Sequence, residues 1–245
     1  MKGIVLAGGL GTRLHPMTKV VNKHLLDVFD EPMIQFPIRS LAQTGLREII
    51  LVTGNEIDQF RCLLGSGSEL GVDLVYERQE GEGGIADALA RAERHLEDDE
   101  AMGVILGDNI YQENLTTYVD EYRAQGRGAK VLLKEVSVED ARRFGVATVD
   151  EGRCVHIEEK PADPQSSLVV TGFYMYDYQV FDVIRGLTPS DRGELEITDV
   201  NNAYVEWGQM TFNVLRGWWT DAGTPPSKLK ASILVALEKG VTFHA

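Results

Sequence analysis

The feature that most constrains this chain is a glycine-rich turn that follows its first apolar run. Residues 4–6 (Ile-Val-Leu) have the length and composition of a buried strand, and residues 8–11 (Gly-Gly-Leu-Gly) come almost directly after them. Glycines allow backbone N–H groups to approach an anion without a side chain in the way. Arg13 lies in the same turn and Lys23 follows one short segment later, so two cations accompany the glycines. The pattern predicts a loop that binds a polyphosphate.

Three alternatives compete with this interpretation. A dinucleotide-binding loop requires Gly-x-Gly-x-x-Gly, but Leu14 stands where the third glycine should be, and only an acid near Asp30 favours that alternative. An ATPase-type P-loop requires Gly-Lys after four intervening residues, but Arg13 stands at that distance from Gly8. The third alternative is a turn with a purely structural role. The loop is most typical of a site that activates a nucleotide.

Composition limits the class of partner. The chain has 245 residues, of which 43% are hydrophobic, enough for a sizeable core in one α/β domain. Its net charge of −14 argues against nucleic-acid polymers and anionic membranes, because both require a broad basic face. Small anionic molecules would need a few local cations and a metal ion. The sequence contains neither a secretory signal nor a membrane-spanning stretch, so we expect a soluble cytoplasmic protein.

The cysteines and histidines predict no chemistry of their own. Cys62 and Cys154 form no Cys-x-x-Cys pair, so neither zinc nor a redox motif is indicated, and we expect both thiols to be buried. The histidines form no triad with a serine or cysteine and are expected to be surface or core residues: His15, His24, His95, His156 and His244.

The order of strand and helix patterns predicts the fold class. In the first half, strands are expected to end near Leu6, Thr53, Tyr76 and Leu106, with helices over 33–43, 57–64, 85–96 and 115–125. This alternation predicts an α/β fold with a Rossmann-like, mostly parallel sheet flanked by helices. The second half predicts a smaller mixed-sheet lobe and a cleft between the two, with strands over 130–136, 145–149, 155–157 and 168–176 and helices near 179–186, 196–207 and 226–239.

Two aspartates are candidates for a metal site. Asp108 follows the apolar run 104–106, which places its carboxylate at the edge where phosphates would lie. Asp221 lies within residues 218–224 (Trp-Trp-Thr-Asp-Ala-Gly-Thr), another tight, glycine-containing turn. Mg²⁺ is usually bound through one or two carboxylates, together with water and phosphate oxygens. Either residue alone is typical of a turn or helix cap, but beside a phosphate loop the two predict a Mg²⁺ site.

Gln79 and Lys160 are candidates for binding the two substrates. Gln79 precedes the turn 81–84 (Gly-Glu-Gly-Gly); its amide can pair with the edge of a base, while Gly84 lets the backbone approach the ring. Thymine and uracil present the same edge, so Gln79 does not choose between them. Lys160 precedes Pro161 and is expected to be extended, with its ammonium directed at a second phosphate; a solvated turn is the alternative.

Taken in order, the motifs of the chain resemble those of the sugar nucleotidyltransferases. The matching segments are spread over nearly the whole chain: 6–14, 23–26, 107–109, 144–146, 158–161, 170–172, 193–199 and 219–224. The first is shared with uridylyl-, adenylyl- and guanylyltransferases, whereas the later ones are most similar to the thymidylyl branch, in a short form without further C-terminal helices. The resemblance implies one nucleotide-diphospho-sugar transferase domain over 1–245, with a nucleotide-binding part of roughly 1–128 and a sugar-phosphate-binding part of roughly 129–245.

The resemblance also implies roles for individual residues. Arg13 and Lys23 would be catalytic, and Asp108 and Asp221 would bind Mg²⁺. The nucleotide-binding set would be Gly8, Gly11, Thr12, Arg13, Lys23, Gln79, Gly84 and Asp108. The sugar-phosphate-binding set would be Gly145, Glu159, Lys160 and Val170.

The reaction implied by the resemblance is transfer of a thymidylyl group from dTTP to glucose 1-phosphate by a homo-oligomer, a dimer or tetramer. Its product, dTDP-glucose, would serve dTDP-rhamnose or a related deoxysugar of polysaccharides. The alternatives are a uridylyltransferase that makes UDP-glucose and a non-catalytic subunit that senses nucleotide-sugars. Asp27 and Asp87 depart from the family pattern, which has proline and glutamine there, and neither is expected to touch the reacting atoms.

Overall fold

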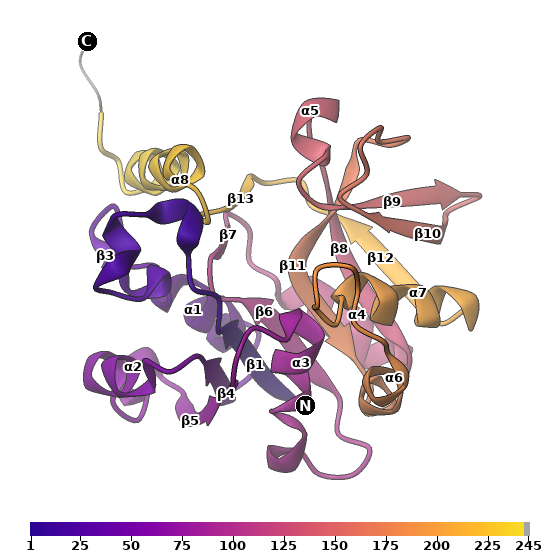
Figure 1. Ribbon diagram of the computed structural model, residues 1–245, viewed down its shortest axis with the longest axis horizontal. Helices are drawn as coiled ribbons and strands as arrows, with labels where there is room; N and C mark the ends of the chain where they lie inside the picture. Colours follow the sequence, from indigo (N-terminus) through magenta and orange to yellow (C-terminus); the bar gives the residue numbers. More distant parts are fainter. Residues whose placement is uncertain (243–245) are drawn as a thin grey trace.

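The computed structural model describes residues 1–242, which form a nine-stranded sheet with helices on both faces (Figure 1). Its first half is parallel and has the order β6-β1-β4-β5. These strands are β1 (Lys2–Ala7), β4 (Glu48–Thr53), β5 (Asp73–Arg78) and β6 (Met102–Leu106). Parallel strands all end at the same edge of a sheet, so the loops that leave these four strands start close together.

The sequence of β1 explains why the sheet is covered on both faces. Successive side chains of a strand point to opposite faces. Ile4 and Leu6 belong to one buried apolar cluster, whereas Val5 and Ala7 belong to another. A strand that is apolar at every position is therefore buried between two layers of helices, as is typical of parallel sheets.

The second half of the chain extends the same sheet. β11 (Leu168–Tyr176) pairs antiparallel with β6, so the two halves are hydrogen-bonded to each other directly. Beyond β11 the sheet continues in two directions, through β9 and β10 and through β8 and β12. These strands are β8 (Ala129–Glu135), β9 (Gly145–Asp150), β10 (Arg153–Glu159) and β12 (Met210–Val214).

The helices divide between the two faces. α1 (Gln35–Gln43), α2 (Ile57–Leu64) and α4 (Thr116–Gln125) pack on the cluster that contains Val5. α3 (Gly84–Ala90), α6 (Val180–Gly186) and α7 (Ile197–Glu206) pack on the cluster that contains Ile4. The short α5 (Val138–Ala141) follows β8, and α8 (Pro225–Glu238) packs over a third, smaller cluster beside β3 (Figure 1).

Small strands and turns complete the structure. β7 (Asn109–Tyr111) pairs with β13 (Trp219–Asp221), and β2 (Asp27–Val28) pairs with β3 (Glu31–Pro32). Single 3₁₀ turns occur at Thr12–Leu14, Met17–Lys19, Lys23–Leu25, Ser68–Leu70 and Glu93–His95. The β7–β13 ladder matters for the site, because it ties two segments more than a hundred positions apart to each other.

The predicted fold class is confirmed, with corrections in detail. The helix expected over 85–96 ends at Ala90, because Arg94 and His95 turn back to bind Glu77 of β5. β7, β12 and β13 were not predicted. The expectation for Cys62 was wrong, since its thiol is exposed, whereas Cys154 is buried.

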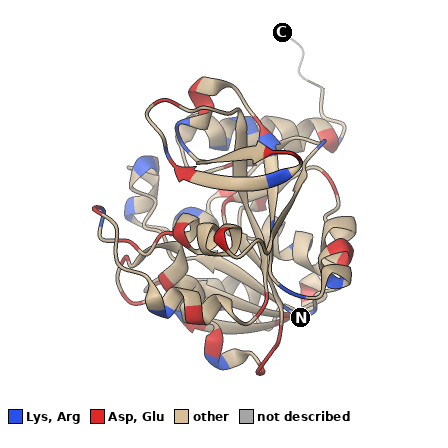
Figure 2. Cartoon of the chain, turned by 90° about the vertical axis from the view of Figure 1, so that its right-hand side faces the viewer, with Lys and Arg blue, Asp and Glu red and all other residues tan. Residues whose placement is uncertain are grey.

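Charged residues of both signs are spread over the described part of the chain. Lys and Arg positions lie scattered among Asp and Glu positions over the face drawn in Figure 2, rather than in one broad basic patch. No helix in the described part of the chain has both the length and the apolar character to cross a membrane. His244 lies outside the described residues.

Candidate active site

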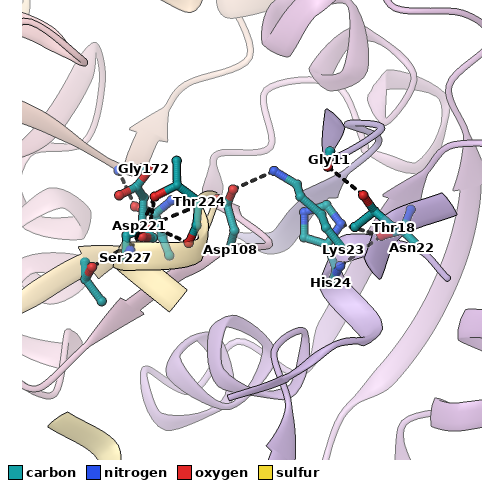
Figure 3. A network of polar contacts seen from close by, with 12 residues as sticks. Gly11, Thr18, Asn22, Lys23, His24, Asp108, Gly172, Asp221, Thr224 and Ser227 are labelled. Atoms are coloured by element: carbon teal, nitrogen blue, oxygen red, sulfur yellow. Dashed lines mark hydrogen bonds and ion pairs between the residues drawn. The ribbon is translucent and has the colours of Figure 1, made fainter. Parts of the chain in front are cut away.

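A cavity of about 460 Å³ opens beyond the carboxyl ends of the parallel strands. Every residue that the resemblance implied for nucleotide binding lines this cavity, although the residues come from four separate segments of the chain. From the implied sugar-phosphate set, only Lys160 lines it. Figure 3 shows the polar contacts at its centre.

The glycine loop is shaped by two contacts. Gly11 has φ +65°, a conformation that favours glycine, and a Cβ there would lie 2.8 Å from Cβ of Lys23. Thr18 donates a hydrogen bond of 2.7 Å to the Gly11 carbonyl, which anchors the turn (Figure 3). Gly11 is thus needed both for the backbone conformation and for the close approach of Lys23.

Lys23 and Asp108 form an ion pair at the centre of the cavity. Nζ of Lys23 lies 2.6 Å from Oδ2 of Asp108, and Figure 3 shows the two side chains directed at each other. Burial alone would raise the pKa of Asp108. The positive charge of Lys23, together with the hydrogen bond that Lys23 donates, holds that pKa well below its ordinary value. The carboxylate therefore stays ionised, as a metal ligand must.

A second carboxylate approaches from β13. The β7–β13 register places Asp221 opposite Asn109, the residue after Asp108. A Cβ on Gly223 would lie 3.2 Å from Oδ2 of Asp108, 3.3 Å from Nη2 of Arg13 and 3.5 Å from Oδ2 of Asp221. One point in the site is therefore within reach of two carboxylates and a guanidinium, and it is open only because residue 223 lacks a side chain.

The two carboxylates at this point repel each other. Burial, together with the negative charge of Asp108, raises the pKa of Asp221 to about 6. Nη2 of Arg143 lies 3.1 Å from both carboxylate oxygens of Asp221 and offsets part of this repulsion. Within residues 1–242 no group of three metal-ligating side chains occurs. A pair of aspartates instead fits Mg²⁺, which takes its remaining ligands from water and phosphate.

Asn109 is a positioning residue that sequence reasoning left without a role. Its Nδ2 donates to Oδ1 of Asp108 (3.0 Å), while its Oδ1 accepts from the backbone N–H of Gly172 (3.0 Å) and from Nε1 of Trp219 (2.7 Å). A Cβ on Gly172 would lie 2.7 Å from the Asn109 amide, so this glycine makes room for it. Asn109 thereby fixes Asp108 against both β11 and β13.

Gln79 lies on the opposite side of the cavity with its amide held in one orientation. Nε2 donates to the carbonyl of Gly84 (3.0 Å) and to Oδ2 of Asp87 (2.9 Å). Oε1 faces the glycine loop, since a Cβ on Gly8 would lie only 2.2 Å from it. Gly84 has φ +91°, and a Cβ there would lie 2.7 Å from the Leu195 carbonyl. Gly8 and Gly84 are therefore both required, because a Cβ at either position would clash with a neighbouring group.

Of the implied sugar-phosphate residues, Gly145, Glu159 and Lys160 form a group on or directly after β9 and β10, whereas Val170 lies on β11. Gly145 pairs with Glu159 in the β9–β10 ladder, and a Cβ on Gly145 would lie 3.5 Å from Oε2 of Glu159. That oxygen accepts a hydrogen bond of 2.6 Å from Thr198, and Oε1 lies 2.7 Å from Nζ of Lys160. Val170 is buried in the apolar core and does not line the cavity.

The expected backbone conformation of Lys160 was wrong. Lys160 is not extended but has φ +46°, and its N–H donates to the Phe144 carbonyl (3.0 Å). A residue before proline avoids the right-handed helical region, and here the left-handed region is used instead. The side chain consequently folds back to Glu159 while it still lines the cavity.

Three further cavity residues had no predicted role. Arg192 binds Glu196 through 2.7 and 2.8 Å contacts, approaches Oε1 of Glu159 at 3.4 Å and, like Glu194, lines the cavity. For Arg192 and Glu194, the motif 193–199 was the only nearby sequence signal. His24 is buried beside Lys23; burial and the charge of Lys23 lower its pKa to about 3, so the ring is neutral at pH 7. Its Nδ1 lies 2.8 Å from Oδ1 of Asn22, so the ring is held in place beside Lys23.

Comparison with known proteins agrees with this geometry. Residues 2–237 match the family described as Nucleotidyl transferase. The glucose-1-phosphate thymidylyltransferase of Neisseria meningitidis is 42% identical over 96% of this chain and 82% of its own length. The Haloferax volcanii nucleotidyltransferase Agl11, of low-salt glycan biosynthesis, is 37% identical over 98% of this chain and 68% of its own length.

Solved structures give the same result. A Bacillus anthracis protein, provisionally named a glucose-1-phosphate thymidylyltransferase and crystallised with sucrose, superposes with a TM-score of 0.91. It is 48% identical and the match covers 100% of this chain and 98% of the other. A UDP-glucose pyrophosphorylase in complex with UDP-glucose shares the fold, with a TM-score of 0.84, 23% identity and coverage of 97% and 98%. By the family match and these identities, the chain belongs to the nucleotidyl transferase family.

Proposed function

We propose that this protein transfers a thymidylyl group from dTTP to glucose 1-phosphate, giving dTDP-glucose and pyrophosphate. The observation that carries the proposal is the convergence of Arg13, Asp108 and Asp221 on one open point beside Lys23. The names of the relatives at 40–42% identity support the choice of substrates. A subunit that only sensed nucleotide-sugars would have no need for two carboxylates at that point.

The nucleophile requires no protein base. A phosphate monoester is largely dianionic at neutral pH, because its second pKa is about 6. An oxygen of the sugar phosphate attacks the α-phosphorus, and the bond from that phosphorus to the bridging oxygen breaks. Pyrophosphate leaves with the electron pair. This is consistent with the neutral, buried His24 and with the lack of any assigned general base.

The enzyme must instead align the two phosphates and balance the charge that accumulates in the transition state. Backbone N–H groups of the glycine loop and the Arg13 guanidinium would hold the triphosphate. The Lys23 ammonium would move from Asp108 to the reacting phosphate. Asp108 and Asp221 would hold Mg²⁺, which when bound supplies positive charge to the phosphate oxygens.

The β9–β10 group would bind the sugar phosphate. Lys160 and Arg192 both line the cavity and supply positive charge for its phosphate, while the Glu159 carboxylate would accept hydrogen bonds from sugar hydroxyls. In this proposal the division near residue 128 separates nucleotide-binding from sugar-binding residues within one domain. We further propose a cytoplasmic homo-oligomer that supplies a deoxysugar pathway.

UTP is the second candidate nucleotide, because Gln79 would meet the same hydrogen-bonding edge in thymine and uracil.

The test is incubation of the purified chain with Mg²⁺, glucose 1-phosphate and either dTTP or UTP, followed by phosphorus NMR and mass spectrometry of the products. We expect dTDP-glucose and pyrophosphate in equal amounts, and no product when the metal is chelated. If neither nucleotide gives a nucleotide-sugar, the proposed function is wrong.

A further inference from the structure

We infer that Asp87 is a positioning residue that makes the base site selective for a pyrimidine with an imino N–H, by locking the amide of Gln79. The inference deepens the proposed function and rests on it for the identity of the ligand.

The amide of Gln79 has only one chemically acceptable orientation. Its side chain is buried, and the two groups nearest Nε2 are the Gly84 carbonyl at 3.0 Å and the Asp87 carboxylate at 2.9 Å. Both are acceptors and neither can donate, so the amide nitrogen must face them. A rotated amide would place its oxygen against two other oxygens and leave both N–H groups without partners.

The Asp87 carboxylate is itself fixed. Oδ1 accepts from Nη2 of Arg91, one helical turn along α3, at 2.8 Å, which leaves Oδ2 for Gln79. Gly83 provides the space, since a Cβ there would lie 2.6 Å from Cγ and Oδ2 of Asp87. Residues of the segment 83–91 thus hold the Gln79 amide in place through hydrogen bonds.

With both Nε2 hydrogens in use, only Oε1 is available to a ligand. Among residues 1–242 no hydrogen-bond donor reaches this oxygen, and the atom is not sealed from solvent. A lone acceptor pairs with the N3–H of thymine or uracil. Cytosine presents an unprotonated N3 at the same place, so two acceptors would face each other. A site built around such a hydrogen bond rejects the ligand that lacks the donor.

The experiment measures binding of dTTP, UTP and dCTP to the intact protein by calorimetry, without sugar phosphate, in the wild type and four variants. In Asp87→Leu we expect the ratio of dTTP to dCTP affinity to fall by about tenfold, because only the Gly84 carbonyl is left to hold the amide in its orientation. Gly83→Ala should behave similarly, since the added methyl group displaces the carboxylate. Asp87→Asn retains an acceptor and should stay within about threefold of the wild-type ratio. Arg123→Gln breaks an exposed ion pair with Asp120 on α4, outside the cavity, and should leave the ratio unchanged.

The affinity ratio is decisive because a merely structural role would change thermal stability and leave the ratio unchanged. An unaltered ratio in folded Asp87→Leu overturns the inference, and so does equal binding of dCTP and dTTP by the wild type. Turnover with glucose 1-phosphate is assayed in parallel. Selective binding that depends on Asp87 in a protein without turnover would defeat the proposed function and leave this inference standing.

Discussion

The proposed nucleotide side of the site, which lines the cavity, and the proposed sugar side, on β9, β10 and β11, differ in how they are built. On the nucleotide side, every implied residue follows a parallel strand or belongs to the loops at its end, and all of them line one cavity. On the sugar side, Gly145 and Glu159 depend on the register of an antiparallel hairpin, and Val170 lies in the core. The order of the parallel strands alone brings the nucleotide residues together, whereas the register of the β9–β10 hairpin positions Gly145 and Glu159.

The largest effect should come from the centre of the nucleotide side. Lys23→Ala removes the cation that we propose to meet the reacting phosphate, and by analogy with the loss of one oxyanion donor kcat should fall roughly 10²- to 10³-fold. Lys19→Ala is the matched control, because Lys19 does not line the cavity. Near-normal turnover by folded Lys23→Ala would refute the assigned role.

A steric change on the nucleotide side should be the next largest. A methyl group on Gly8 would lie 2.2 Å from Oε1 of Gln79, so Gly8→Ala must displace the amide that faces the base. We expect KM for dTTP to rise on the order of 10- to 100-fold with KM for glucose 1-phosphate unchanged. In Gly9→Ala the nearest atom is Cε of Lys23 at 3.6 Å, so a much smaller effect is expected. Equal effects would contradict the close contact.

Glu159→Gln tests whether the sugar side is a separate unit. Glu159 accepts from Thr198 and pairs with Lys160, and the amide would keep the size but lose the charge. KM for glucose 1-phosphate should rise about tenfold while KM for dTTP stays within twofold of wild type, measured by steady-state kinetics. The neighbouring Glu158 is exposed and serves as the control in Glu158→Gln. A shift in both KM values would mean that the two sides are not separable.

The smallest effect on catalysis should come from a buried carboxylate outside the cavity. Burial opposes ionisation of Glu77, but hydrogen bonds from Arg94 and His95 more than offset this and lower its pKa to about 2. A lowered pKa stabilises the folded state above the ordinary value of 4.5, and this contribution is lost as the pH falls from there to about 2. Glu77→Gln should cost about 1–3 kcal/mol at pH 7 without changing kcat.

The measurement for Glu77 is denaturant unfolding of wild type and variant between pH 2.5 and pH 7. The difference in unfolding free energy should shrink toward low pH. A constant difference, or a loss of turnover in the folded variant, would place Glu77 in a different role.

The contrast between the two sides also explains which features could be predicted from the sequence. Apolar runs that end in Gly8, Gln79 and Asp108 predict both the parallel sheet and the edge where these residues meet. The conformation of Lys160 and the position of Arg192 depend on tertiary pairing, which local patterns do not encode. Asp87 is the clearest case: from the sequence it is a departure without a contact, and only the fold brings it to Gln79.

We propose that the open point between Arg13, Asp108 and Asp221 serves nucleotidyl transfer to a sugar phosphate with thymidylyl preference. The most direct measurement is pyrophosphate release with Mg²⁺ and glucose 1-phosphate, comparing dTTP, UTP, ATP and GTP side by side. A clearly higher kcat/KM for dTTP than for the other three is the expected result. Comparable or better use of UTP would contradict the thymidylyl preference, and no release with any nucleotide would contradict the transfer itself.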